Sequence, residues 1–224
     1  MSCNFPVFRT DSQGRVRPCP CKRCLGCRND RREEFTQRLQ LELKTYNYIG
    51  SFITLTYRDE ELPQLLPLGS AVSGEQFKGR IPAGTLYKPD LTSFRDKLNH
   101  RIKYKYGYSI KYVLVGEYGM ESDNPRPHYH GIILGLPSGD RELLYDTWNK
   151  GRIDIDSVNH AAIRYTLKYI DKQIFGADPI YQAYGDFYPP FAFFSNGLGD
   201  RFYKQNKDKF NKLGEYYFIF FCVL

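Results

Sequence analysis

The chain has 224 residues, the size of one ordinary domain with enough length to bury a core. It carries a formal net charge of +7, and many of its 19 tyrosines and 16 phenylalanines lie among basic residues. This combination favours single-stranded nucleic acid as a partner; the plainer alternative is a soluble basic protein with a solvated charged face. No apolar segment reaches transmembrane length and the N-terminus lacks a signal-peptide pattern, so we expect a cytoplasmic protein without a membrane partner.

The N-terminal segment, residues 1–30, has no clear periodicity and is rich in cysteine. It contains Cys3, Cys19, Cys21, Cys24 and Cys27. In a reducing compartment such crowding indicates metal binding rather than disulfides, and four thiolates can close a structural Zn²⁺ site. The tight spacing makes it difficult for the four clustered cysteines to meet one ion, so Cys3 is a candidate to replace Cys19 or Cys21. The alternative is a set of reduced cysteines without metal.

The next part of the chain predicts two helices, a strand and a long loop. Apolar residues recur at helical spacing over 28–46 and 90–105, and Asp90 after a proline is the expected N-cap of the second helix. A β-branched and aromatic run predicts a strand over 49–57. Prolines and glycines predict a loop over 58–88. The basic runs at 28–32 and 97–105 are candidate phosphate contacts, although exposed helix faces are the usual explanation.

The second half of the chain predicts a hairpin followed by shorter elements. Strands are expected over 111–118 and 128–136, joined by a turn-rich loop. A short helix over 141–148, a short strand over 152–156 and a longer helix over 160–174 follow. The tail is rich in Gly, Pro, Tyr and charge, and its apolar end, 216–224, predicts an added strand or a buried terminus.

Two histidines in the predicted hairpin indicate a metal site. Strand side chains alternate between faces, so His128 and His130 point the same way. If the hairpin places Val115 or Glu117 opposite His130, Glu117 joins the histidine face, whereas a one-residue slip sends it to the other face. Two imidazoles and a carboxylate suit Mg²⁺ or Mn²⁺ bridged to phosphate, with Zn²⁺ as an alternative. An H-x-H pattern also arises by chance, but the chain has only four histidines.

Two tyrosines on the predicted helix 160–174 are candidate nucleophiles. Tyr165, Tyr169 and Lys172 form a stripe offset by two positions from an apolar stripe that includes Ile163 and Leu167, so the stripes lie on roughly opposite sides. A phenol can attack phosphorus when a metal polarises the phosphate, and Lys172 can stabilise phosphate charge or lower a phenol pKa. The alternative is that both tyrosines pack in the core with their hydroxyls at its rim.

At these residues the chain resembles the rolling-circle replication initiators of the HUH endonuclease superfamily. The resemblance is greatest to those of gokushovirus-type microviruses, which are single-stranded DNA bacteriophages. It runs along most of the chain, through the segments CLGCR, ITLTYRDEELP, GTLYKPDLTSFRDKL, VGEYG, RPHYHGIIL and RYTLKYIDK. The last two segments are specific together, and each alone is modest.

The resemblance implies a fold, a division of the chain and a site. The implied fold is α+β, with a central antiparallel sheet flanked by helices (the HUH endonuclease fold, split βαβ-like) and a small N-terminal cysteine-rich element. The implied parts are a cysteine-rich element over 1–30, an endonuclease domain over 31–175 and a C-terminal extension over 176–224. The implied metal ligands are Glu117, His128 and His130, and the implied catalytic residues are Tyr165, Tyr169 and Lys172.

The resemblance also implies an activity. By this likeness, the protein nicks single-stranded DNA at an origin in the cytoplasm of a bacterial host. It holds the 5′ end on a tyrosine, and later rejoins strands, together with a host helicase and polymerase. Two interpretations of the residues compete with it. One is a metal-dependent phosphodiesterase that uses water and has structural tyrosines. The other is a non-enzymatic, zinc-containing nucleic-acid-binding protein.

Overall fold

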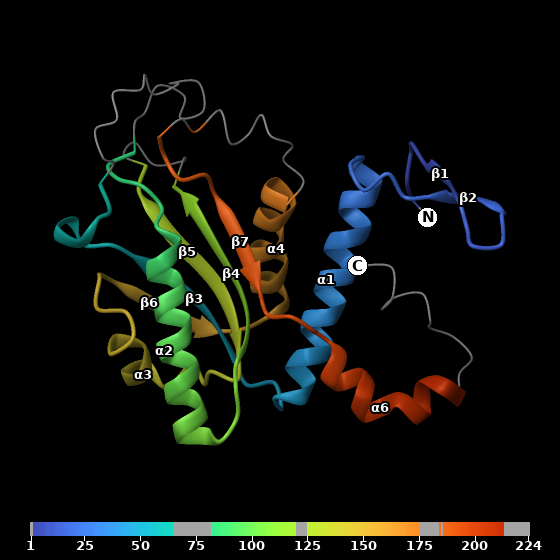
Figure 1. Cartoon of the computed structure of the whole chain (residues 1–224). Helices are drawn as coiled ribbons and strands as arrows, with labels where there is room; N and C mark the ends of the chain where they lie inside the picture. Colours follow the sequence, from blue (N-terminus) through green and yellow to red (C-terminus); the bar gives the residue numbers. More distant parts are fainter. Residues whose placement is uncertain (1, 65–81, 120–124, 175–183, 185, 213–224) are drawn as a thin grey trace.

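A five-stranded antiparallel sheet in the order β6-β3-β5-β4-β7 lies at the centre of the molecule (Figure 1). The computed structural model describes residues 2–64, 82–119, 125–174, 184 and 186–212, with backbone only over 168–174 and 209–212. The strands are β3 (Gly50–Thr56), β4 (Lys111–Tyr118), β5 (Pro127–Leu134), β6 (Ile153–Ser157) and β7 (Phe191–Phe194). Their pairing confirms the predicted hairpin of β4 and β5.

Helices cover both faces of the sheet, which confirms the predicted α+β fold. On one face lie α2 (Lys88–Tyr106) and α3 (Arg141–Tyr145), and on the other lie α1 (Leu25–Thr45) and α4 (His160–Ile174). Helix α6 (Asp200–Lys212) packs against α1, and a separate hairpin of β1 (Val7–Thr10) and β2 (Val16–Cys19) precedes α1. A 3₁₀ turn, η1 (Asp59–Glu61), follows β3.

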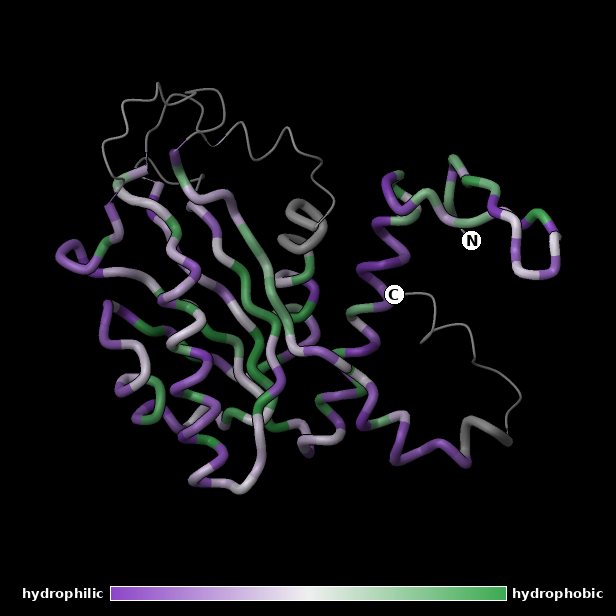
Figure 2. Tube along the Cα trace, viewed as in Figure 1, coloured by the Kyte–Doolittle hydropathy of each residue, from purple (hydrophilic) through white to green (hydrophobic). Residues whose placement is uncertain are grey.

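Each face of the sheet has its own hydrophobic core, and the two cores follow from strand alternation. Leu114, Tyr129 and Ile133 point toward α2 and α3, whereas Val113 and Ile132 point toward α1 and α4. Figure 2 shows hydrophobic residues concentrated along the strands, while α6 and much of α1 are hydrophilic. The side chains of the histidine face therefore lie in the same layer as α1 and α4.

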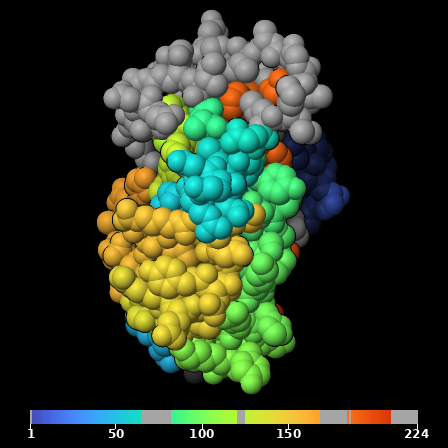
Figure 3. Space-filling model, turned by 90° about the vertical axis from the view of Figure 1, so that its left-hand side faces the viewer, coloured from blue at the N-terminus to red at the C-terminus, as the bar shows by residue number. Residues whose placement is uncertain are grey.

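The apolar stripe of α2 shows why this segment is helical and where it packs. Leu91, Phe94, Leu98 and Ile102 recur at three- and four-residue spacing and are all almost fully buried. Burying a side chain of this size contributes about 1.5–3 kcal/mol. The helix ends at Gly107, whose φ of 78° is the left-handed conformation that glycine adopts at helix ends. Figure 3 shows α2 (green), α3 (yellow) and the segment after β3 (cyan) forming one continuous surface.

One close approach within the sheet requires a glycine. A Cβ at position 131 would lie only 2.2 Å from Cδ2 of Leu114 and 3.0 Å from the carbonyl oxygen of Val113. The missing side chain therefore makes room for Leu114 in the core against α2. Because Gly131 directly follows His130, this packing also fixes the strand beside the histidines.

The prediction that Asp90 is the N-cap of α2 is wrong. The helix begins earlier, with Tyr87 at the N-cap, because Pro89 fits the first turn of a helix, where an N–H has no helical partner. The carboxylate of Asp90 is used differently. It accepts a hydrogen bond from the hydroxyl of Tyr57 at 3.0 Å and pairs with Lys150 at 3.4 Å.

The elements that the sequence did not predict lie near the two ends of the chain. They are the β1–β2 hairpin, β7 and α6. The predicted helix over 160–174 coincides with α4, and the other predicted elements differ from the observed ones by a few residues at their ends. The apolar segment 216–224 lies outside the described residues, so its predicted strand or buried end stays a prediction.

Candidate active site

Glu117, His128 and His130 converge on the central strands β4 and β5. The register pairs Glu117 with His128 and Val115 with His130, so the carboxylate joins the histidine face, as one of the two predicted registers requires. Oxygen Oε1 of Glu117 lies 3.1 Å from Nε2 of His128 and 3.0 Å from Nε2 of His130. The ligand atoms of the three residues all lie within 4.8 Å of one another, which makes them a group that could hold a metal ion.

A second layer of hydrogen bonds orients both imidazoles. Nδ1 of His128 lies 3.0 Å from the carbonyl oxygen of Arg126, and Nδ1 of His130 lies 3.0 Å from Oγ1 of Thr54 on β3. A carbonyl oxygen only accepts, so Nδ1 of His128 carries the proton. Metal-binding histidines are held in this way, with one nitrogen bonded to an oxygen and the other directed at the ion.

The donor set fits a hard or borderline divalent cation. Burial disfavours ionisation of Glu117, but hydrogen bonds from His128 and His130 outweigh it and lower its pKa to about 2. The carboxylate is therefore anionic near neutral pH. Two imidazole nitrogens that face one carboxylate oxygen need protons or a cation between them, and a bound ion satisfies all three groups.

Three aromatic rings connect the metal-binding group to α4. The ring of Phe52 stacks on His130, with centroids 5.9 Å apart and an interplanar angle of 11°. The ring of Tyr165 meets both edge-on, at 5.6 Å from His130 and 6.0 Å from Phe52. Tyr165 is 42% exposed, so its ring packs against the site while its side chain still reaches solvent. The side chains of Tyr169 and Lys172 lie outside the described residues.

The phenol between the two histidines in the sequence points away from the site. Tyr129 is fully buried on the opposite face, and its hydroxyl lies 2.8 Å from that of Tyr57. It also accepts a hydrogen bond from the backbone N–H of Tyr87 at 2.9 Å. Burial raises the pKa of Tyr57 and Tyr129, so both phenols stay protonated and hold α2 against the sheet.

A polar cleft of about 660 Å³ lies beside Tyr165, between α1 and α4. Its walls are Asn29, Asp30, Arg32, Glu33 and Thr36 from α1, with Arg164 and Tyr165 from α4. The sequence pointed to the basic run 28–32 but not to its position opposite α4. The structure thus places charged and polar side chains of a distant segment at the candidate nucleophile.

Four of the five N-terminal cysteines form a second group that could hold a metal ion. Cys3, Cys21, Cys24 and Cys27 have sulfur atoms within 4.8 Å of one another, and Cys19 lies outside this group. Backbone N–H groups of Cys27 and Asn4 lower the pKa of Cys24 to about 6, whereas burial raises that of Cys27 to about 12.

The fold and the site define an α+β protein with a histidine–carboxylate metal-binding group on its central antiparallel sheet. The model of the replication-associated protein ORF2 family matches residues 50–174, more than half of the chain, and the chain belongs to this family. The matched range extends from β3 to the end of α4 and includes every candidate site residue outside the cysteine group.

Three curated relatives come from viruses of bacteria. The replication-associated protein ORF2 of Spiroplasma virus 4 is 27% identical over 86% of this chain and 59% of its own length. ORF4 of Chlamydia phage 1 is 24% identical, over 72% of the chain and 40% of the relative. VP4 of Bdellovibrio phage phiMH2K is 25% identical, over 69% and 48%. The aligned part therefore spans about half the length of these relatives. No solved structure matches the chain. Among the described helices, none combines the length and apolar character needed to cross a bilayer.

Proposed function

We propose that this protein initiates DNA replication by nicking single-stranded DNA at an origin with a tyrosine nucleophile. The observation that carries the proposal is the contact between Tyr165 and the ring of His130, which brings a phenol beside a histidine–carboxylate group. The family and its replication-associated relatives support it. The remaining steps follow from the chemistry of the residues.

Glu117, His128 and His130 would hold a divalent cation, Mg²⁺ or Mn²⁺, through one oxygen and two nitrogens, which leaves coordination positions for phosphate oxygens. When bound, such an ion polarises a phosphate oxygen and makes phosphorus more electrophilic. The residues themselves supply position. The hydrogen bonds from Thr54 and the Arg126 carbonyl keep both Nε2 atoms directed at one point.

Tyr165 is the proposed first or second nucleophile. Its phenol oxygen bonds to phosphorus as the bond from phosphorus to the 3′ oxygen breaks, and the 3′ oxygen takes up a proton. The products are a 5′-phosphotyrosyl link and a 3′-hydroxyl that a host polymerase can extend after a host helicase opens the duplex. Because the phosphotyrosyl ester keeps the energy of the broken bond, attack by a 3′-hydroxyl reverses the step and rejoins strands without ATP.

Tyr169 is the proposed partner nucleophile, and Lys172 the proposed phosphate contact. Residues four apart lie on the same side of a helix, so Tyr169 follows Tyr165 one turn along α4. Two phenols allow one to hold the first 5′ end while the other attacks the regenerated origin. A lysine one turn further on would balance the charge of the second phosphate.

The cleft between α1 and α4 is the proposed path of the DNA strand to Tyr165. Its walls carry the guanidinium groups of Arg32 and Arg164, which suit phosphate oxygens. The exposed part of the Tyr165 ring is available for a base to stack on. The net charge of +7 favours the same polyanion. We place this activity in the cytoplasm of a bacterial host.

A covalent-adduct assay tests the proposal. The protein is incubated with Mn²⁺ and single-stranded segments that tile the replicon encoding this chain, each labelled at its 3′ or its 5′ end. A 5′-phosphotyrosyl link retains the 3′ label on the protein in a denaturing gel, whereas a 5′ label leaves with the other fragment. We expect the adduct to disappear in the Tyr165→Phe, Tyr169→Phe double variant and to persist in Tyr104→Phe, whose ring is 91% exposed.

The outcomes separate the competing functions. Cleavage without an adduct that survives in the double variant would indicate attack by water and overturn the tyrosine mechanism. Binding without cleavage, in the presence of Mn²⁺ and on every segment, would indicate a non-enzymatic DNA-binding protein. A Glu117→Gln variant should lose both cleavage and adduct while remaining folded, because the amide cannot replace the anionic ligand.

A further inference from the structure

The N-terminal part of α1 and the hairpin before it have few apolar contacts to hold them. Every residue of β1 is exposed, and in β2 only Cys19 is partly buried. A two-stranded hairpin of this kind is marginally stable in water. The residues of α1 that reach the core begin at Phe35, two to three turns after the helix starts. Figure 1 shows this end of α1 and the hairpin projecting beyond the sheet.

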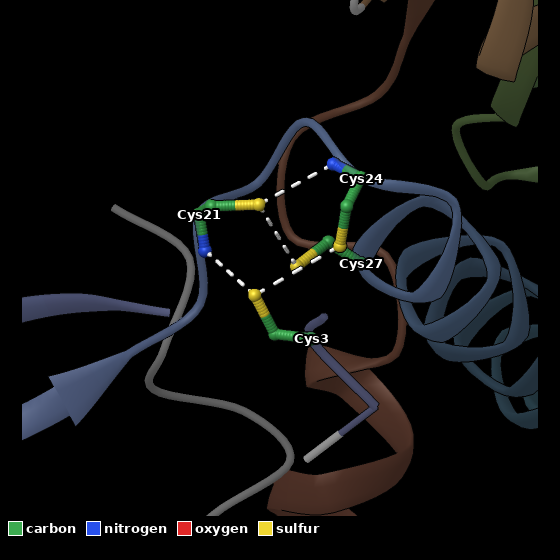
Figure 4. A group of neighbouring side chains, drawn as sticks. All are labelled: Cys3, Cys21, Cys24 and Cys27. Atoms are coloured by element: carbon green, nitrogen blue, oxygen red, sulfur yellow. Dashed lines mark hydrogen bonds between the residues drawn. The ribbon is translucent and has the colours of Figure 1, made fainter. Parts of the chain in front are cut away.

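Four cysteines meet at this unsupported end. Figure 4 shows the sulfur atoms of Cys3, Cys21, Cys24 and Cys27 directed toward a common centre. Cys21 and Cys27 have sulfurs 3.9 Å apart, and Cys3 and Cys24 have sulfurs 3.8 Å apart. A tetrahedral zinc ion with Zn–S distances of about 2.3 Å holds its sulfurs about 3.8 Å apart, whereas a disulfide needs about 2.05 Å. The spacing therefore fits a tetrahedral thiolate site.

The backbone around the cysteines has the form of a metal-binding turn. The N–H of Cys24 donates to the sulfur of Cys21 at 3.3 Å, and the N–H of Cys21 donates to the sulfur of Cys3 at 3.2 Å. Such bonds stabilise thiolate over thiol. Lys22, inside the turn, has a φ of 63°, the left-handed conformation that side-chain-bearing residues rarely adopt. A bound ion would offset the cost of this strained turn.

The chain start is fitted closely over the first turn of α1. A Cβ at Gly26 would lie 1.8 Å from the carbonyl oxygen of Ser2, so only glycine allows this approach. The N–H of Ser2 lies 3.4 Å from a carboxylate oxygen of Asp30. Cys3 thereby reaches the three cysteines of the helix start, and Cys19, which ends β2, stays outside.

We propose that Cys3, Cys21, Cys24 and Cys27 bind one structural Zn²⁺ that fixes the N-terminal end of α1. On binding, the four thiols release their protons to solvent, and the thiolates outweigh the charge of the ion. Among the described residues, no side chain caps α1 and its first turn has no acidic residue, so a negatively charged site there complements the helix dipole. The fixed end continues directly into the residues that line the cleft beside Tyr165.

Metal analysis of the whole chain tests the proposal without using DNA cleavage. We expect about one zinc per chain after purification and washing with a weak chelator, released when a mercurial reagent blocks the thiols. Cys24→Ser should lose at least nine-tenths of this zinc. Cys19→Ser, a change to the cysteine outside the group, should keep it. Failure of the proposed replication activity would leave these results unchanged.

Cobalt substitution distinguishes the two metal-binding groups. Co²⁺ bound by four thiolates gives intense visible absorption and thiolate charge-transfer bands, whereas Co²⁺ on Glu117, His128 and His130 gives no thiolate band. We expect the thiolate bands in the native chain and in Cys19→Ser, and their loss in Cys24→Ser. A native chain that takes up no zinc and no thiolate-bound cobalt, with all its thiols reactive, would overturn the proposal even if Cys24→Ser fails to fold.

Discussion

Thr54 should act as a positioning residue for the metal-binding group, and Thr54→Val tests this. The hydroxyl of Thr54 lies 3.0 Å from Nδ1 of His130, whose side chain is only 10% exposed. With Nε2 directed at the ion, Nδ1 carries the proton and the hydroxyl accepts it. Valine keeps the shape of threonine but accepts nothing, so the buried N–H loses its partner and the imidazole can adopt its other tautomer.

The structure sets the size of the effect. A neutral hydrogen bond contributes about 0.5–1.5 kcal/mol, and losing the partner of a metal-binding histidine weakens affinity by roughly 10- to 100-fold. Phe52 still stacks on the ring of His130 in the variant, so its orientation is partly kept. We therefore expect a loss of Mn²⁺ affinity near the lower limit, about tenfold, or about 1.4 kcal/mol.

Mn²⁺ titration followed by electron paramagnetic resonance of the free ion measures this loss. Thr56→Val is the matched control because Thr56 lies two residues along the same strand and the same face, opposite His128. Within the described part of the chain its hydroxyl makes no hydrogen bond to an imidazole, so the affinity of this variant should stay within about twofold. Equal losses in both variants would refute the reasoning, since they would reflect disturbance of β3 rather than of His130. Unchanged affinity in Thr54→Val would refute it as well.

Three further predictions concern stability and are read from urea unfolding. The carboxylate of Glu42 is fully buried and accepts a backbone hydrogen bond at the start of α6, so Glu42→Gln should cost about 1–3 kcal/mol; no loss would mean that α6 docks without it. Tyr129→Phe leaves the hydroxyl of Tyr57 and the backbone at the start of α2 without a partner, and should cost about 1–3 kcal/mol; an unchanged midpoint would contradict this role. Gly131→Ala should destabilise through a clash with Leu114, and the double variant with Leu114→Ala should lose less than the sum of the two; strict additivity would exclude the clash.

The helices with clear apolar stripes were predictable because their burial follows from spacing alone. Leu91, Leu98 and Ile102 repeat at helical intervals and are buried as that pattern requires. The strands β4 and β5 were predictable for the same reason, since alternation decides which residues face each core. Helix starts were less predictable, as Asp90 shows, because Pro89 allowed α2 to begin before the residue that looks most like a cap.

The elements near the ends depend on contacts that no local pattern encodes. Strand β7 is four residues long and owes its form to pairing with β4, in which Val113 lies opposite Phe194. Helix α6 is docked by the buried carboxylate of Glu42, which lies 157 residues before its hydrogen-bonding partner. Neither partner can be identified from spacing, so the sequence left this part of the chain without elements.

The site divides in the same way. The spacing of His128 and His130 and one register choice were enough to place Glu117 beside them. The hydrogen bond from Thr54 comes from β3, across the sheet, and α1 reaches the cleft only through packing of distant segments. Sequence spacing also left open which cysteine joins the clustered three. The fit of Ser2 over Gly26 brings Cys3 there, and no periodicity contains that fit.

The two faces of β5 explain how a short pair of histidines is held in one register. His128 and His130 face the metal-binding group, and Tyr129 between them faces the opposite core, where its hydroxyl binds the backbone of Tyr87 and the hydroxyl of Tyr57. A slip of one residue would bury both imidazoles among apolar side chains and expose a phenol whose hydrogen bonds are broken, so it is strongly disfavoured. The core that anchors α2 thus fixes the direction of the histidines, and the precision of the candidate site comes from the face of the sheet that takes no part in it.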